Sequence, residues 1–123
     1  MTDKRPATDP AILAVFDTMI AAVPGVERKG ATMPYVSVNG NMYGMINKAG
    51  VIGLRLEPND RASFFATFGD SPFEGVPGFV NADYVAIPEA LYGRTKVLHT
   101  WFRMSHASAN RLKPKPTTRA RKD

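Results

Sequence analysis

The spacing of apolar residues changes from a helical period to a strand period and back along this chain, and this change limits the fold more than any other feature. Near the N-terminus the apolar residues recur at the spacing of one helix face: Ile12, Leu13, Val15, Phe16, Met19, Ile20 and Val23. Asp9-Pro10 predicts the start of this helix, because an aspartate caps free backbone N–H groups and a proline costs no hydrogen bond in the first turn. Pro24-Gly25 predicts its end.

The middle of the chain has the signals of an antiparallel meander. Three short β-prone runs cover residues 35–38, 42–46 and 51–56, with the turn sequences Asn39-Gly40 and Lys48-Ala49-Gly50 between them. In the third run Ile52, Leu54 and Leu56 share one strongly apolar face, because side chains alternate along a strand. We expect the N-terminal helix to cover this face.

The second half of the chain predicts two more helices and a further strand. The predicted elements are a short helix from Pro58, a loop over 73–79, a strand over 84–87, a helical turn over 88–92 and a last amphipathic helix over 97–112. The predicted fold class is α+β, with an antiparallel β-meander of four to five strands packed on one face by the N-terminal and C-terminal helices. We expect one domain at 9–112, a disordered N-terminus at 1–8 and a basic disordered tail at 113–123.

The positive charge of the chain is concentrated at its C-terminus. Residues 1–110 contain ten lysines and arginines and ten acids, so the formal net charge of +5 comes from the last thirteen residues. Their six cations are candidate phosphate contacts: Arg111, Lys113, Lys115, Arg119, Arg121 and Lys122. Weak, non-specific nucleic-acid binding through this tail is one alternative function, and a tail that only keeps the protein soluble is the other.

Few residues in the sequence are suited to catalysis or to metal binding. The chain has no cysteine, which excludes thiol catalysis and cysteine zinc sites. His99 and His106 are the only histidines, and on one helix they lie about 10.5 Å apart along the axis, too far to share a metal ion. The serines do not occur in a nucleophile motif, and the glycines do not form a phosphate-binding pattern. We therefore predict no catalytic, cofactor-binding or metal-binding residue, and no enzyme activity.

The aromatic, acidic and glycine residues are expected to have structural roles. The aromatic residues expected in the core are Phe64, Phe65, Phe68, Phe73, Phe79 and Trp101. The residues that could instead stack on RNA bases are Tyr35 and Tyr43. The acids expected to cap or stabilise the second helix are Glu57, Asp60, Asp70 and Glu74. The glycines expected to serve turns or bulges are Gly40, Gly44, Gly50 and Gly53.

Several short motifs follow one another in an order that is typical of one protein family. They are Gly40-Asn41-Met42-Tyr43-Gly44, Gly53-Leu54-Arg55-Leu56, Asp60-Arg61, Pro72-Phe73, Tyr84-Val85-Ala86-Ile87-Pro88 and a Trp101-containing helix that runs into Leu112-Lys113-Pro114-Lys115. In this order they resemble the TfoX N-terminal domain over residues 12–115, and the YjbR-like domains are a related alternative. The resemblance implies a regulatory role, as in the control of natural competence. It transfers no catalytic or ligand-binding residue to this chain.

Together these observations favour a small non-enzymatic domain that acts as a regulatory or protein-interaction module with a protein partner. The polar N-terminus does not have the pattern of a signal peptide, and the apolar runs are too short for a membrane span. We therefore expect a cytoplasmic protein of bacterial type without membrane contact, for which a homo-oligomer is compatible with the sequence. A small-molecule pocket, or an enzyme without a recognisable motif, is the remaining alternative.

Overall fold

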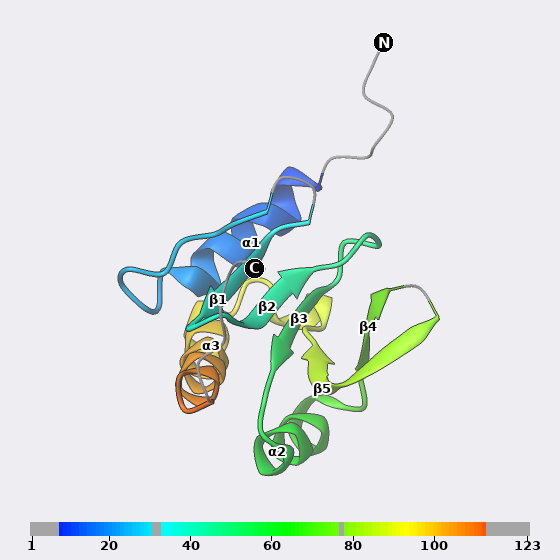
Figure 1. Ribbon diagram of the computed structural model, residues 1–123. Helices are drawn as coiled ribbons and strands as arrows, with labels where there is room; N and C mark the ends of the chain where they lie inside the picture. The colour runs from blue at the N-terminus through cyan, green and yellow to red at the C-terminus, as the bar shows by residue number, and fades with distance from the viewer. Residues whose placement is uncertain (1–7, 31–32, 77, 113–123) are drawn as a thin grey trace.

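A five-stranded antiparallel sheet with helices packed against it organises the chain (Figure 1). The computed structural model describes residues 8–30, 33–76 and 78–112. In chain order the elements are α1 (Pro10–Ile20), β1 (Tyr35–Val38), β2 (Asn41–Ile46), β3 (Ile52–Arg55), α2 (Pro58–Phe68), β4 (Pro72–Val76), β5 (Phe79–Ala86), the 3₁₀ helix η1 (Glu89–Leu91) and α3 (Thr95–Asn110). The predicted α+β fold, with an antiparallel sheet and helices near both ends of the domain, is confirmed.

The strand order in the sheet is β1-β2-β3-β5-β4, and every neighbouring pair is antiparallel. Strands β1 to β3 form the predicted consecutive meander. The chain then passes through α2 and returns as the hairpin β4–β5, whose second strand pairs with β3 through Gly53–Ala86 and Leu54–Val85. Strand β4 is therefore the outer strand on that side of the sheet.

Helix α1 begins as the sequence predicts. The Asp9 carboxylate accepts a hydrogen bond of 2.8 Å from the backbone N–H of Ala11, and Pro10 is the first helical residue. The helix ends at Ile20, three residues before the last apolar position of its predicted face. The next turn tightens instead, because the N–H groups of Ala22 and Val23 bond to carbonyls three residues back.

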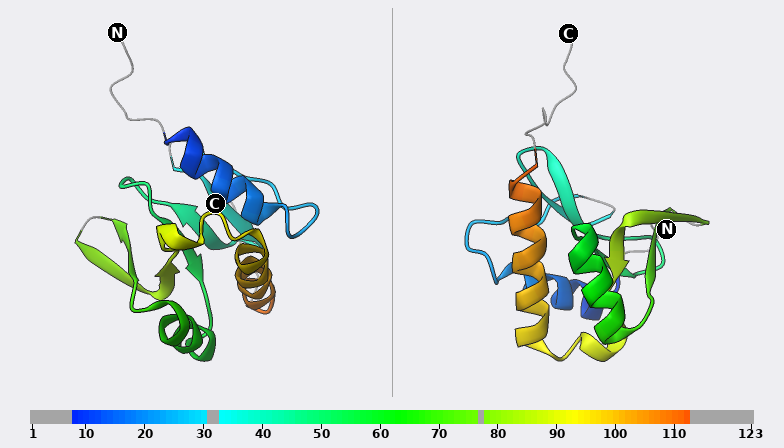
Figure 2. Two further views of the ribbon diagram at one scale, coloured as in Figure 1. Left: turned by 180° about the vertical axis from the view of Figure 1, so that it is seen from behind. Right: turned by 90° about the horizontal axis from the view of Figure 1, so that it is seen from below.

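Helices α1 and α3 lie on the same face of the sheet, the face turned away from the viewer in Figure 1 (Figure 2, left). The predicted apolar face, Ile52 and Leu54 of β3 and Leu56 just after it, is fully buried in the main core, so its predicted burial is confirmed. The helix that packs directly on β3 is α3, and α1 packs beside α3. The buried residues of α3 are Leu98, Phe102, Ser105, Ser108 and Ala109. The Nε2 atom of His99 lies 2.8 Å from the Thr18 carbonyl and so joins α3 to α1.

A bulge in β2 directs Tyr43 into this core. Val36 pairs with Gly44 and Ser37 pairs with Met42, so Tyr43 is the extra residue between them. Its buried ring packs against Phe102 at a centroid distance of 5.5 Å. The buried Ser105 hydroxyl donates to the Arg55 carbonyl at 2.7 Å and reaches the Tyr43 carbonyl at 3.2 Å, so α3 supplies the polar partner that the sheet lacks beside the bulge.

Helix α2 packs beside α3 through aromatic rings. The Trp101 ring lies edge-on to Phe64 at 5.1 Å and to Phe68 at 6.0 Å. Of the six aromatic residues expected in the core, Phe64 and Phe73 are buried, and Phe65, Phe68 and Trp101 are partly buried. The prediction for Phe79 is wrong, because its side chain is 71% exposed.

The predicted loop over 73–79 is also wrong. Strand β4 covers Pro72–Val76 and β5 begins at Phe79, five residues before the strand predicted at 84–87. The glycines of this stretch indicated a loop, yet Gly78, with φ +84°, lies in the turn just before β5. Proline has no backbone N–H to donate to a neighbouring strand. It is compatible with the start of β4 because an outer strand pairs along one edge alone.

Candidate functional site

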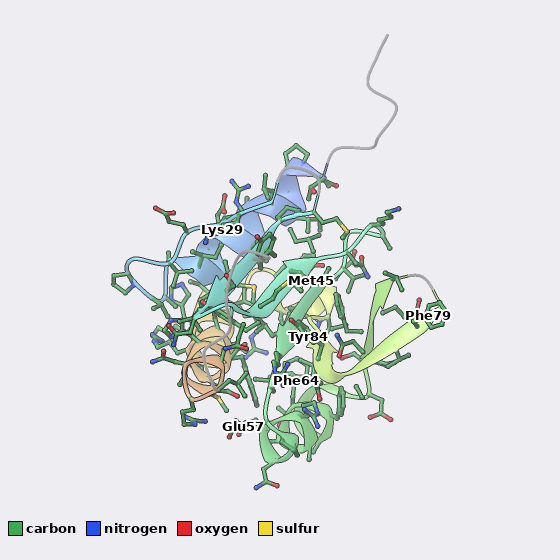
Figure 3. The ribbon with its side chains drawn as sticks, in the orientation of Figure 1. Lys29, Met45, Glu57, Phe64, Phe79 and Tyr84 are labelled. Atoms are coloured by element: carbon green, nitrogen blue, oxygen red, sulfur yellow. The ribbon has the colours of Figure 1, made fainter. Side chains whose placement is uncertain are left out.

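The face of the sheet opposite α1 and α3 has a second, smaller apolar cluster. Its buried members are Met45, Phe73, Tyr84 and Ala86, and partly buried Met33, Tyr35 and Val51 pack against them. Figure 3 marks Met45 and Tyr84 in this part of the molecule. The β4–β5 hairpin contributes Phe73, Tyr84 and Ala86, so the base of the hairpin is anchored in a core of its own.

Gly53 makes room for this anchor. A Cβ atom at Gly53 would lie 2.6 Å from the Phe73 ring, so the ring occupies the space where a side chain would stand. Phe73 stacks on Tyr84 with ring centroids 5.5 Å apart, and the Tyr84 hydroxyl donates to the Met42 carbonyl at 3.0 Å. Burial raises the pKa of Tyr84 to about 12. Gly53 was expected to serve a turn or bulge, and the structure shows that close packing explains it instead.

Beyond this base the hairpin leaves the regular sheet. The pairing passes from Pro72–Val85 to Glu74–Val80, which leaves extra residues on the β5 side. Within this irregular stretch the Asn81 side chain accepts a hydrogen bond from the Asp83 N–H at 3.1 Å. The Asp83 carboxylate lies 3.7 Å from the guanidinium groups of both Arg55 and Arg61. We call residues 74–76 and 78–82, which run from this stretch to the end of the hairpin, the distal hairpin.

The distal hairpin carries three exposed apolar side chains, which we call the tip patch: Val76, Phe79 and Val80. They are 53%, 71% and 57% exposed, and Figure 3 shows Phe79 at the outer end of the hairpin. The same three side chains, with Gly75, Asn81 and Ala82, line a shallow hollow of about 400 Å³ that is open to solvent. Exposed apolar residues that cluster in this way are typical of an interaction surface, whereas single exposed ones are ordinary.

Beside the strand pairing, Glu74 takes part in two hydrogen bonds that hold the distal hairpin in place. The Asn47 side chain, in the β2–β3 turn, donates to the Glu74 carbonyl at 2.8 Å. The Glu74 carboxylate accepts from the Gly78 N–H at 3.1 Å and so closes the hairpin turn on itself. Glu74 was expected to act on the second helix, and this contact places it on the hairpin instead.

The polar residues considered for chemistry are engaged in contacts within the fold. The Ser105 hydroxyl donates to the Arg55 carbonyl, a His99 ring nitrogen bonds to the Thr18 carbonyl, and the His106 ring lies edge-on to Tyr43 at 5.4 Å. Over residues 8–30, 33–76 and 78–112, histidines and acids do not gather in a group of three or more that could hold a metal ion.

Glu57 differs from its predicted role. It stands at the N-cap of α2, but its side chain makes no capping hydrogen bond within the described chain. Its carboxylate instead accepts a 2.7 Å charged hydrogen bond from Arg111, at the C-cap of α3. Among the candidate phosphate contacts, Arg111 lies within the described residues, and its guanidinium pairs with the Glu57 carboxylate of α2.

The other candidate phosphate contacts lie outside the described residues: Lys113, Lys115, Arg119, Arg121 and Lys122. The predicted disordered segments 1–8 and 113–123 lie outside them too, apart from Thr8. Of the two tyrosines considered for RNA stacking, Tyr35 is partly buried and Tyr43 is fully buried. The stacking alternative is therefore wrong for Tyr43, because the bulge turns its ring toward α3.

Comparison of the chain with protein-family models, with curated proteins and with solved structures found no match. The resemblance to TfoX N-terminal domains therefore stays a prediction from the sequence motifs. Each helix in the described ranges is too short or too polar to cross a membrane.

The tip patch is the feature that the sequence predictions missed. A signal for the hairpin is present in the sequence. Two apolar residues precede Gly78, namely Phe73 and Val76, and two follow it, namely Phe79 and Val80. Short apolar runs around a glycine turn are typical of a hairpin.

Proposed function

We propose that this protein is a non-enzymatic protein-interaction module whose docking surface is the tip patch. The observation that carries the proposal is the exposure of Phe79, Val80 and Val76 together at the end of one hairpin. Large apolar side chains in water favour association with another apolar surface, since burial removes them from solvent. The resemblance to TfoX N-terminal domains supports a regulatory role in the cytoplasm of a bacterial cell.

The rigid base of the hairpin supports this function. The stacked Phe73 and Tyr84 rings fix β4 and β5 on the sheet, and the Asn47 side chain fixes β4 from the β2–β3 turn. A partner therefore meets a hairpin whose base is already held in place, which lowers the entropy cost of binding. Because the patch consists of three side chains, we expect a transient complex rather than a permanent one.

Photo-cross-linking from position 79 tests the proposal. A photoreactive phenylalanine analogue is placed at Phe79 and, as a matched control, at the exposed Ala66 of α2. In the cells that express the protein, we expect a discrete covalent adduct with a protein from position 79 and none from position 66. The adduct partner is then purified, and Phe79→Ser and Val80→Ser should each weaken its binding by about tenfold or more, while Ala66→Ser leaves binding unchanged.

Two results would contradict the proposal. One is the same adduct pattern from both positions, which would indicate chance encounters. The other is a purified adduct partner that binds Phe79→Ser and Val80→Ser as tightly as the unaltered protein.

A further inference from the structure

We infer that the exposed face of α3 is a second binding surface, which takes duplex DNA by its phosphate backbone without reading the base sequence. This inference is independent of the tip patch. Five exposed residues, spaced three or four apart along the helix, form the surface, which we call the α3 stripe: Lys96, Thr100, Arg103, Ala107 and Asn110.

The first observation is that the charges of the chain are separated along the sequence. Residues 1–89 contain seven lysines and arginines and ten acids, a formal charge of −3. Residues 90–122 contain nine lysines and arginines and no acid, a formal charge of +9. Helix α3 therefore belongs to the positive part of the protein, and a stretch of one sign of charge attracts a polyanion.

The second observation is that the cations of the α3 stripe are not neutralised by neighbouring acids. Within residues 8–30, 33–76 and 78–112, the side chains of Lys96 and Arg103 make no hydrogen bond and no ion pair. In contrast, Arg28 bonds to Asp17, and two further arginines both face one aspartate of β5. The charges of the stripe are therefore available to an anion from outside the chain.

The third observation is that the start of α3 carries cations where they do not stabilise the helix. Arg94 is the N-cap residue, Lys96 lies in the first turn, and this turn has no acid. The N-terminal end of a helix has a partial positive charge, so cations there repel it. A phosphate group that binds beside them would replace this repulsion with attraction. An external anion thus explains these cations better than helix stability does.

The shape of α3 fits a duplex. The helix has 16 residues and is about 24 Å long, about two-thirds of a turn of B-DNA. It lies along one side of the molecule (Figure 2, right). Lys96 and Arg103 lie about 10.5 Å apart along its axis, and the small side chains of Thr100 and Ala107 between and beyond them permit close approach to a backbone.

The composition of the α3 stripe favours duplex DNA over other nucleic acids. Single strands bind to surfaces with aromatic side chains on which their bases stack, and the stripe has no aromatic residue. The major groove of an RNA duplex is deep and narrow, whereas that of B-DNA admits an α-helix.

An anionic membrane is the competing surface. A helix that lies in a membrane interface inserts large apolar side chains among the lipids. The large apolar residues of α3, such as Leu98 and Phe102, are buried in the core instead. The α3 stripe is small and polar between its cations, so it has nothing to insert.

Fluorescence anisotropy of a dye-labelled DNA duplex, titrated with the full chain, tests the inference. We expect binding at about 1–100 µM protein, with equal affinity for duplexes of different sequence. At about 50 mM salt, Lys96→Gln and Arg103→Gln should each weaken binding about tenfold, since each removes one phosphate contact. The double variant should also make the slope of log affinity against log salt shallower by about 2.

Lys48→Gln is the matched control, because it removes the same charge from the exposed β2–β3 turn, across the molecule from α3 (Figures 1 and 2). This variant should bind DNA as the unaltered protein does, and so should Phe79→Ser, which alters only the tip patch. Circular dichroism melting curves identify any variant that has not folded.

Three results would overturn the inference. The first is an equal loss of affinity from Lys48→Gln and from the α3 substitutions, which would show that net charge binds DNA without a defined surface. The second is tighter binding to an RNA duplex or a single strand than to a DNA duplex. The third is no binding to DNA at about 100 µM protein in low salt, whether or not the chain binds vesicles of phosphatidylserine and phosphatidylcholine.

Discussion

Replacing Phe102 with alanine is expected to lower the free energy of unfolding by about 3–5 kcal/mol, because a fully buried aromatic ring is lost and a cavity remains. Phe102 lies on the inner face of α3, where its ring packs against Tyr43 of the β2 bulge. The site cannot collapse easily, because the same face of α3 is also fixed by the hydrogen bond from Ser105 to the Arg55 carbonyl. Urea unfolding followed by circular dichroism measures the change.

The neighbouring residue provides the control for this substitution. Arg103 is exposed on the same helix, so Arg103→Ala should change the free energy of unfolding by less than about 0.5 kcal/mol. If Phe102→Ala cost no more than Arg103→Ala, α3 would not pack on the sheet through this face.

Replacing Gly53 with alanine is expected to cost about 1–3 kcal/mol, since the added methyl group would overlap the buried Phe73 ring. The backbone of Gly53 is not in the left-handed region, so the expected cost is steric rather than conformational. Gly75→Ala in β4 is the matched control, because a Cβ there meets no atom of the described residues within 4 Å. That variant should be as stable as the unaltered protein or slightly more stable.

A double substitution identifies the ring as the cause. In Gly53→Ala/Phe73→Leu the smaller side chain leaves space for the methyl group, so the two changes together should cost less than the sum of their separate effects. Strictly additive costs would show that Gly53 is required for a reason other than Phe73.

Much of the fold could be predicted because its signals are local. The cap at Asp9, the helical spacing up to Ile20, and Asn39-Gly40 between β1 and β2 each specify one element without information from elsewhere. Asn39 and Gly40 both have positive φ, as the predicted hairpin turn requires. These elements were predicted to within a few residues.

The errors come from features that depend on distant residues. Alternation along a strand places consecutive residues on opposite faces, but the bulge in β2 lets Tyr43 and Gly44 both face the helices. Gly53 needs its small size because of Phe73, twenty residues later in the sequence. The spacing of apolar residues cannot report either effect.

The candidate site was missed for a related reason. A phenylalanine is more often buried than exposed, so Phe79 was placed in the core. The structure sets Phe79 beyond the irregular stretch of β5, on a part of the hairpin that extends past the sheet and its helices. Burial depends on which elements lie above a residue, and the sequence around Phe79 does not specify them.

The stability of Phe79→Ser is the most direct test of the claim that Phe79 is a contact residue rather than a core residue. The measurement is the free energy of unfolding in urea, at a protein concentration low enough to keep the chain monomeric. With its ring 71% exposed, Phe79 contributes little to folding, and we predict a change of less than about 0.5 kcal/mol. A loss of about 3 kcal/mol or more, as expected for a buried phenylalanine, would contradict the account.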